Sequence, residues 1–461
     1  MRYKKPPLSL LKNVAEPENR FNDLAERYRY RLLEGFKSDG IDVECVSTNV
    51  SPMNIVFGFK LLNIKRYQEI KNSVESYFGD DAKVFQTGEM VDVFSVSLLK
   101  PERSYVSLRK IIESDEFINA ESDLTIAVDV EENSRICCVD LKQAPHLLVS
   151  GTTGSGKTVF MDDIILSIIY KSDPDLVKLV LVDPSQKDLS LYSGIPHLMF
   201  PVITEKPYAV EAAMYLKKLM DKRFDLLARE GYKNIDRFNA YSSKKMAYIV
   251  VVIDKYLEMT YDIPPVFEEC IAEIARKGRA AGIHLIINTQ SARADVISND
   301  IKINFPYRAA FSVVDWHESK AILDKTGAQK LLGNGDLLIR YGEDKTPSHV
   351  QTAYVSESEI YDIVKYVVDN NKAVDYEVNY DEKVQEIDDT DTEYIRSILL
   401  AISNNRSVNV YTIQKTMDVG YPEAYRIMKF LEENKIVTGF KIGKKREVNQ
   451  TALEKMLEEY K

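Results

Sequence analysis

"GTTGSGKT", residues Gly151 to Thr158, is the stretch that decides the fold. It fits the pattern G-x-x-x-x-G-K-[ST], follows the apolar run "PHLLVS" and precedes the helix-forming run "TVFMDDIILSIIYK". A strand, a glycine-rich loop and a helix in this order form a phosphate cradle, because backbone N–H groups and the positive end of the helix dipole surround the anion. The motif predicts ATP bound through Gly151, Thr152, Thr153, Gly154, Ser155, Gly156, Lys157 and Thr158. Lys157 would reach the β- and γ-phosphates, and the Thr158 hydroxyl would ligate Mg²⁺.

Short apolar strands follow this loop in alternation with helical segments. They read "KLVLVD", "YIVVVID", "HLIINTQ", "RAAFSV" and "DLLIR", and together with "HLLVS" they predict an α/β domain on a mainly parallel sheet. Asp254 ends the strand "YIVVVID" and is the predicted second Mg²⁺ ligand at the carboxyl edge of the sheet. Gln290, at the end of "HLIINTQ", is predicted to sense the γ-phosphate or to orient water. Asp183 ends "KLVLVD" and either faces the same crevice or only forms a turn before Pro184.

Lys255 departs from the pattern expected of an ATPase, in which a water-activating glutamate follows the strand-end acid. A lysine cannot orient water as a carboxylate does unless burial severely lowers its pKa. Loss of a catalytic base typically costs about 10²–10⁴-fold in rate. Glu258 lies one helical turn beyond Asp254 and is one substitute, while Asp183 or Asp188 is another. The remaining alternative is a subunit that binds ATP without hydrolysing it.

Length and composition limit the classes of protein that fit. The 461 residues predict two or three domains, and 45% apolar content is enough for sizeable cores. No apolar run reaches the roughly 18 residues that a membrane span needs, and the N-terminal stretch lacks a signal-peptide cleavage site. We therefore expect a cytoplasmic chain without a membrane anchor. The net charge of −10 argues against a protein coated by nucleic acid and permits DNA binding through a local patch or an internal channel. Scattered cysteines and histidines predict no structural metal site.

Composition shifts along the chain predict five parts. Residues 1–18 form an N-terminal arm, 19–140 an α+β domain, 141–360 the P-loop motor, 361–390 an acidic linker and 391–461 a C-terminal winged helix. In the last part, "DTEYIRSILLAISNN", "TIQKTMD" and "YPEAYRIMKFLEENKI" are three helices, followed by the strand "VTGF" and the basic "KIGKKREV". The third helix would enter a major groove while wing residues contact phosphates. Those wing residues are Lys441, Lys444, Lys445 and Arg446.

The motor motifs resemble those of the FtsK/SpoIIIE DNA translocases, in the order found in that family. They are "PHLLVSGTTGSGKT", "LVDPSQKDLSLYSGIPHL", "YIVVVIDKYLEM", "ARKGRAAGIHLIINTQ", "INFPYRAAFSV" and "GAQKLLGNGDLLI". The resemblance implies a homohexameric ring of RecA-like motors around double-stranded DNA, with ATP bound between subunits. It makes Arg279 and Arg308 the candidates for an arginine that completes the neighbour's site. Arg293 and Lys302 would face DNA in the pore.

The resemblance extends to both flanking parts. Residues before the motor resemble the α domain of the family, and the C-terminal part resembles its γ domain, which reads a short polar DNA sequence. Arg426 matches a basic reader in the third helix, whereas Pro422 and Lys429 stand where an amide and an acid are familiar, so the DNA preference would differ or be lost. The implied function is an ATP-driven double-stranded DNA translocase in DNA segregation or transfer. The alternatives are a conjugative or packaging ATPase, and an ATP- and DNA-binding accessory subunit that does not hydrolyse ATP.

Overall fold

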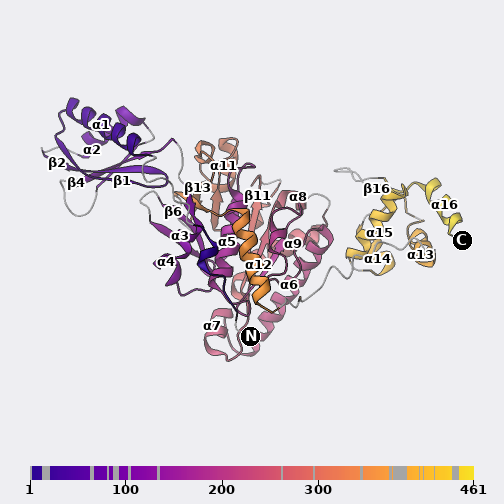
Figure 1. The fold of residues 1–461 in the computed structure, drawn as a ribbon. Coiled ribbons are helices and arrows are strands. Elements are labelled where there is room, and N and C mark those ends of the chain that lie inside the picture. The colour runs from indigo at the N-terminus through magenta and orange to yellow at the C-terminus, as the bar shows by residue number, and fades with distance from the viewer. Residues whose placement is uncertain are drawn as a thin grey trace.

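Three bodies follow one another along the chain in this computed structural model (Figure 1): an N-terminal α+β unit, a central α/β motor and a small C-terminal unit. The structure describes residues 3–12, 21–62, 67–79, 82–86, 93–101, 105–131, 135–260, 263–293, 296–342, 346–372, 376, 392–403, 405–408, 410–419, 421–438 and 446–460. No helix in these ranges is long and apolar enough to cross a membrane. Most of the predicted acidic linker, residues 361–390, lies outside them, and its first ten residues belong to the last helix of the motor.

The N-terminal unit is a four-stranded antiparallel sheet, in the order β1-β2-β4-β3, packed against two helices. The apolar positions of the helices α1 and α2 and the inner face of the sheet form its core, in which the rings of Phe36, Phe59 and Phe94 contact one another. The elements are α1 Asn22–Ser38, β1 Val43–Val50, β2 Asn54–Leu61, α2 Tyr67–Phe78, β3 Ala82–Gln86 and β4 Val93–Leu99.

The motor is built on a second sheet, in the order β7-β6-β14-β13-β12-β8-β11-β10-β9, with the short β5 paired to β14. The five strands from β12 to β9 are parallel, the pairs from β12 through β13, β14 and β6 to β7 are antiparallel, and β5 lies parallel to β14. The strands are β5 Val106–Ser107, β6 Thr125–Glu131, β7 Ile136–Asp140, β8 His146–Ser150, β9 Val177–Val182, β10 Tyr248–Ile253, β11 Ile283–Thr289, β12 Tyr307–Ala310, β13 Asp336–Arg340 and β14 Ser348–Tyr354. The predicted boundary at residue 140 therefore falls inside this sheet, because β5 to β7 pair with β14 or with each other. By sheet membership, the α+β unit ends near Leu99.

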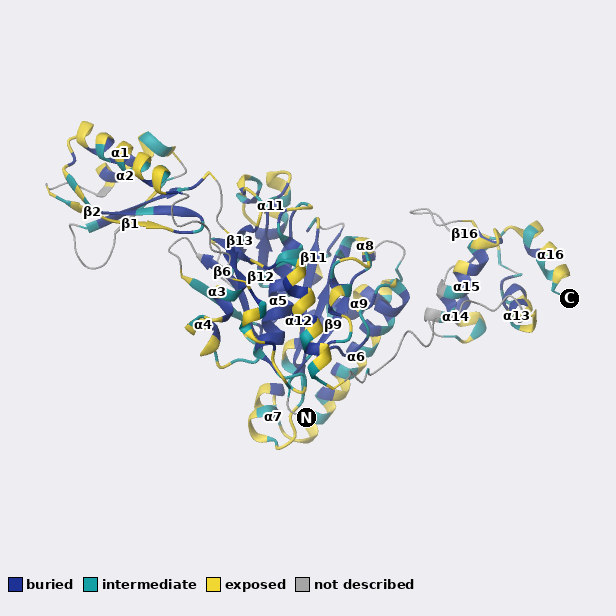
Figure 2. Ribbon diagram, in the orientation of Figure 1, coloured by how far each residue is buried: buried dark blue, intermediate teal, exposed yellow. Residues whose placement is uncertain are grey.

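Helices cover both faces of the central sheet, so its parallel strands are buried on both sides (Figure 2). Val250 and Val252 of β10 join one core cluster, and Ile249, Val251 and Ile253 join the other. This explains why β10 reads as a continuous apolar run without alternation. The helices are α3 Leu108–Ile112, α4 Asp115–Ile118, α5 Lys157–Lys171, α6 Lys206–Arg229, α7 Ile235–Tyr241, α8 Tyr256–Thr260, α9 Pro265–Ala281, α10 Asn299–Lys302, α11 Trp316–Leu323 and α12 Glu357–Asn370, with the 3-10 turns η1 Leu8–Leu10, η3 Leu189–Tyr192 and η4 Ala328–Lys330.

The predicted N-terminal arm packs on the motor along residues 3–12. The Tyr3 hydroxyl donates to the carbonyl of Ile169 at 3.0 Å, and its ring meets the edge of His197. Leu11 is almost fully buried in the motor core, and the Lys12 N–H donates to the Glu359 carboxylate at 2.6 Å. The chain therefore contacts the motor before it enters the α+β unit.

The C-terminal unit has its own apolar core and the element order expected of a winged helix. Its elements are α13 Thr392–Ile402, β15 Ser407–Val408, α14 Val410–Met417, α15 Tyr421–Glu433, β16 Arg446–Glu447 and α16 Gln450–Glu459. Strand β15 pairs antiparallel with β16, and Val437 forms a bridge with Val448. The final helix α16 is an addition to the three helices expected from the sequence. The predicted wing residues Lys441, Lys444 and Lys445 lie outside the described residues, as does the side chain of Arg446.

Candidate functional site

The P-loop is held between two neighbouring loops at the carboxyl edge of the sheet. On one side, the backbone N–H and the hydroxyl of Thr152 both donate to the carbonyl of Ser312, at 2.8 and 3.0 Å. On the other side, the N–H of Gly335 donates to the carbonyl of Ser155 at 3.1 Å. Gly156 sits at φ +115°, and a Cβ on it would lie 2.7 Å from the Gly335 nitrogen. The loop before β13 is thus part of the phosphate cradle, and a side chain at position 156 would push it away.

Gly335→Ala is expected to lower both the thermal stability of the motor and its affinity for ATP. Gly335 has φ +86°, and a Cβ on it would lie 2.6 Å from both Gln351 Nε2 and Thr352 Oγ1. Strain and crowding together are expected to cost about 2 kcal/mol or more. Gly333→Ala is the matched control, since Gly333 has φ +80° but nothing within 4 Å of its would-be Cβ. Thermal unfolding and ATP titration of both variants measure the difference. Equal losses in the two variants would show that only backbone strain matters.

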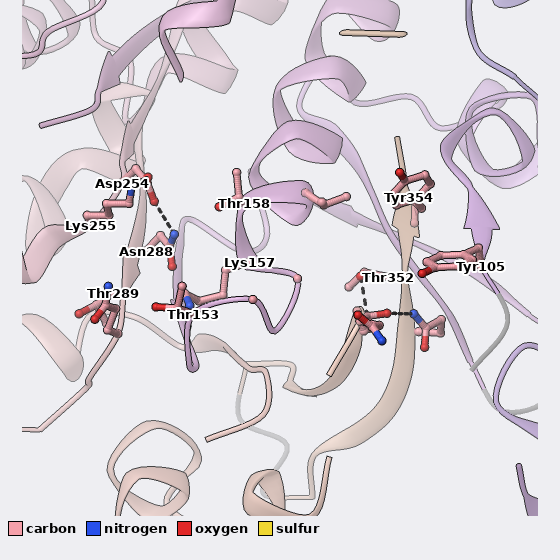
Figure 3. A pocket seen from close by; sticks show the side chains of 18 residues that line it. Tyr105, Thr153, Lys157, Thr158, Asp254, Lys255, Asn288, Thr289, Thr352 and Tyr354 are labelled. Carbon is pink, nitrogen blue, oxygen red and sulfur yellow. Dashed lines mark hydrogen bonds and ion pairs between the residues drawn. The ribbon is translucent and has the colours of Figure 1, made fainter. Parts of the chain in front are cut away.

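A cavity of about 280 Å³ opens beside the P-loop (Figure 3). One end contains the predicted chemistry: Lys157, Thr158, Asp254, Lys255 and Gln290, together with Asn288. The other end is lined by Tyr105, Gln351 and Tyr354, which the sequence alone did not single out. The strand order explains the first set, because β11 lies between β8 and β10 and all three strands end at this edge. Residues 153–154, 156–159, 254–255 and 288–290 therefore line one space.

Lys157 is buried and folded back onto its own loop. Its Nζ donates to the carbonyls of Gly151 and Thr152, both at 2.7 Å. Burial lowers the pKa of Lys157 to about 8, against the opposing effect of the Asp254 charge. The ammonium group is still largely protonated at neutral pH. Binding a phosphate in the loop would replace the two carbonyl acceptors by charged oxygens, which form stronger hydrogen bonds with an ammonium group.

Asp254 and Asn288 form a buried pair at the end of the cavity where Mg²⁺ is predicted to bind. Asn288 Nδ2 donates to Asp254 Oδ1. Burial raises the pKa of Asp254 to about 6, and the hydrogen bond from Asn288 and the charge of Lys255 oppose that rise. Asp254 Oδ2 is buried and accepts no hydrogen bond from the part of the chain that the structure describes. With the Thr158 hydroxyl lining the same cavity, this carboxylate oxygen fits a Mg²⁺ ligand.

Lys255 lies in the left-handed region, at φ +49°, and extends into a cluster of acids. Its Nζ donates to Ser185 Oγ at 2.6 Å and to Asp188 Oδ2 at 2.7 Å, and it lies 3.9 Å from Asp254 Oδ2. Burial alone lowers the pKa of Lys255, but the hydrogen bond and charge of Asp188 and the charges of Asp254 and Asp183 outweigh it, and the pKa is raised. Lys255 is therefore a protonated cation. The raised pKa argues against a neutral Lys255 that acts as a base.

The three candidate replacements for the missing carboxylate have different surroundings. Asp183 is fully buried, and its two oxygens accept four hydrogen bonds from Ser185, Asp188 and Leu189, so it forms the turn after β9. Glu258 is exposed on α8 and does not line the cavity. Asp188 is ion-paired with Lys255. Among the described residues that line the cavity, Asp254 is the one carboxylate.

The two candidate trans arginines differ in their availability. Arg279 is exposed at the end of α9, and its Nε donates to the carbonyl of Lys142 at 3.2 Å. Because Lys142 precedes β8, Arg279 lies exposed at the edge of the sheet opposite its own P-loop. Arg308 is buried, pairs with Asp324 at 3.0 Å and donates to three backbone carbonyls. For Arg308 to act on a neighbour, those internal bonds must break.

The candidate DNA contacts are distributed over the motor and the C-terminal unit. Arg293 is exposed and lies 3.4 Å from the Glu318 carboxylate. Lys302 Nζ donates to the carbonyl of Ala292 at 3.0 Å. In α15, Arg426 is ion-paired with Glu423, and Lys429 is exposed and lies 3.9 Å from Glu433. An acid accompanies Arg293, Arg426 and Lys429, so DNA phosphates would compete with carboxylates at these positions.

Comparisons with known proteins agree with this geometry. The family model described as "FtsK/SpoIIIE family" matches residues 107–294. The DNA translocase FtsK of Caldanaerobacter subterraneus subsp. tengcongensis is 30% identical over 453 residues, covering 97% of this chain and 64% of the relative. The DNA translocase SftA of Bacillus subtilis is 36% identical over 355 residues, covering 75% of this chain and 37% of the relative. The chain thus spans less than two thirds of the length of these relatives.

Solved structures share the fold of the motor. The monomer form of the pCW3 conjugation coupling protein TcpA with ATPγS aligns with a TM-score of 0.52 and 21% identity, covering 75% of this chain and 100% of that chain. The cytoplasmic domain of the Thermomonospora curvata Type VII secretion ATPase EccC aligns with a TM-score of 0.50 and 19% identity, covering 59% of this chain and 35% of that chain. The predicted RecA-like P-loop fold is confirmed. At these identities the likeness concerns the fold alone.

Proposed function

We propose that this chain, which belongs to the FtsK/SpoIIIE family, is the motor of an ATP-driven double-stranded DNA translocase. The observation that carries the proposal is the convergence of Lys157, Thr158, Asp254 and Asn288 on one cavity beside the P-loop. The curated relatives described above are DNA translocases, and the alignment with the FtsK relative runs over nearly the whole chain. The ring is a homo-oligomer, hexameric by family resemblance, with DNA in its pore. It serves DNA segregation or transfer.

The residues of this chain divide the work as follows. The P-loop amides and Lys157 would hold the triphosphate, and the Thr158 hydroxyl and Asp254 Oδ2 would hold Mg²⁺, whose charge would offset that of the phosphates. Asn288 keeps the Asp254 carboxylate oriented through its hydrogen bond to Oδ1. Gln290 lines the cavity at the phosphate end and orients water or contacts the γ-phosphate. Arg279, exposed at the opposite edge of the sheet, completes the site of the neighbouring subunit.

A second candidate function is favoured by Lys255. A protonated lysine in the position expected for a base leaves the cavity without a water-activating carboxylate among the described residues. This arrangement suits an accessory subunit that holds ATP and DNA without hydrolysing the nucleotide. We prefer the active motor, because the chain contains both the Asp254–Asn288 pair, which we propose as part of the Mg²⁺ site, and an exposed Arg279, and both would serve hydrolysis.

The test is ATP hydrolysis by the purified chain with and without double-stranded DNA, followed by displacement of a triplex-forming oligonucleotide from linear DNA. The translocase predicts DNA-stimulated turnover and ATP-dependent displacement. Stimulated turnover without displacement contradicts translocation by this chain alone. ATP binding with no turnover in either condition supports the accessory subunit instead. Lys302→Ala and Arg293→Ala, the pore candidates, should weaken the stimulation by DNA more than the basal rate.

A further inference from the structure

We propose that the end of the cavity remote from Asp254 is an adenine-recognition subsite, in which Tyr105 and Tyr354 contact the face of the base and Gln351 reads its amino group. This inference rests on the proposed function, since it concerns the same nucleotide. It goes further by assigning the base-binding residues and the preference for ATP over GTP.

The position of the subsite follows from the phosphate cradle. In Figure 3, Lys157 and Thr158 lie between the corner formed by Asp254 and Lys255 and the end formed by Tyr105 and Tyr354. With the γ-phosphate directed toward the Asp254 corner, the ribose and base of the nucleotide must extend toward the other end. All of these residues line one continuous cavity, so the base has a path to the two tyrosines.

The two tyrosines form an aromatic wall of the kind that binds a purine. Their ring centroids are 5.1 Å apart and the planes are inclined at 51°. Tyr105 is 46% exposed and Tyr354 is 38% exposed, although both line a cavity at the edge of the motor core. Large aromatic side chains left half-exposed beside a cavity have faces available for stacking, and base stacking is tolerant of the exact angle. The pairing of β5 with β14 keeps the rings together, since Tyr105 precedes β5 and Tyr354 ends β14.

Gln351 supplies the polar recognition. Its side chain is 2% exposed, and its Nε2 donates to the carbonyl of Asn334 at 2.8 Å. Oε1 is buried and accepts no hydrogen bond from the described residues. The Asn334 carbonyl fixes the orientation of the amide, because the reversed amide would bring two oxygens together. Gln351 therefore presents an acceptor. Adenine carries an amino donor at its C6 position, whereas guanine carries an oxygen there, so the subsite favours ATP.

The experiment compares the affinities of ATP, GTP and inorganic tripolyphosphate for the full chain by calorimetric titration with Mg²⁺. Tyr354→Ala is expected to weaken ATP about 10-fold, given the usual contribution of aromatic stacking, and to change tripolyphosphate affinity less than about twofold. Tyr354→Phe should keep the ATP affinity, since it retains the ring. Gln351→Met removes the acceptor at similar volume and should bring the ATP-to-GTP affinity ratio close to one.

The outcomes separate this inference from the proposed function. If Tyr354→Ala weakens tripolyphosphate as much as ATP, the ring supports the P-loop and the subsite assignment is overturned. It is likewise overturned if the wild-type chain binds ATP and GTP equally, or if Gln351→Met leaves the ratio unchanged. If the wild-type chain binds neither ATP nor tripolyphosphate, the proposed function itself fails.

Discussion

Lys157→Met is expected to abolish ATP binding at concentrations that saturate the wild-type chain, an affinity loss of about 10²-fold or more. The estimate follows from the cost of removing one partner of a buried, hydrogen-bonded charge pair. Among the described residues that line the cavity, the other cation is Lys255, which is bound to Asp188 and Ser185 and so cannot replace the Lys157 ammonium. Methionine keeps the length and most of the volume of the side chain, so the buried position stays filled. DNA-stimulated hydrolysis should be lost together with binding.

Calorimetric titration with ATP and with tripolyphosphate measures this loss directly. Both ligands should be affected equally, because Lys157 acts on the phosphates and not on the base. Lys277→Met is the control, since Lys277 is exposed on α9 and pairs only with Glu273 along the same helix among the ion pairs described. Thermal unfolding of both variants checks that the motor stays folded. A Lys157→Met chain that keeps wild-type affinity would show that the nucleotide does not bind at this loop.

Lys255→Glu is expected to raise the maximum rate of ATP hydrolysis about 10²-fold, the usual contribution of a general base. The substitution places a carboxylate next to Asp254, within the cavity and beside the predicted metal site. It also removes the ammonium group that now binds Asp188. The backbone conformation at φ +49° is no more strained for glutamate than for lysine, so the fold should tolerate the change. Steady-state rates at saturating ATP, Mg²⁺ and double-stranded DNA provide the measurement.

Lys255→Gln separates the two consequences of this change. Glutamine removes the positive charge as glutamate does, but it cannot accept a proton. If Gln and Glu raise the rate equally, the gain comes from releasing Asp188, and Asp188 becomes the carboxylate that activates water. If neither raises the rate, the native site already obtains its carboxylate from elsewhere, for example from a neighbouring subunit. If only Lys255→Glu raises the rate of hydrolysis, position 255 is where the water-activating base is missing.

Local patterns were sufficient to predict the phosphate cradle and the acid that ends β10. The P-loop motif, the strand before it and the helix after it are adjacent in sequence, and Asp254 follows an apolar run directly. Asn288 was not singled out from the sequence because it stands inside the buried strand β11, next to the polar residues that end this strand. The signal was present: Asn288 is an uncharged polar side chain in an otherwise apolar run. Its role depends on the position of β11 between β8 and β10.

Local sequence patterns do not identify residues whose contacts depend on the pairing of strands that are distant in sequence. Tyr105 was assigned to the α+β domain and Tyr354 to the end of the motor, and the contact between them arises from the pairing of β5 with β14. Distant pairing also explains why the predicted boundary at residue 140 falls inside the motor sheet, since β6 pairs with β14 and β7 pairs with β6. Arg308 sits in a motif that resembles a subunit contact, whereas the fold buries its guanidinium against Asp324.

The packing of residues 3–12 on the motor changes how the α+β unit relates to the rest of the chain. Leu11 and Val106 share one core, and Arg109 Nη1 donates to the carbonyl of Leu11 at 3.3 Å. The chain therefore leaves the motor and returns to it at almost the same place, so the unit is a cassette inserted into one continuous fold. Such an inserted unit can be exchanged or lost without interrupting the apolar core of the motor. Tyr105 is the first described residue of the motor after this unit, so the residue that we place against the bound nucleotide also stands where the chain re-enters the motor.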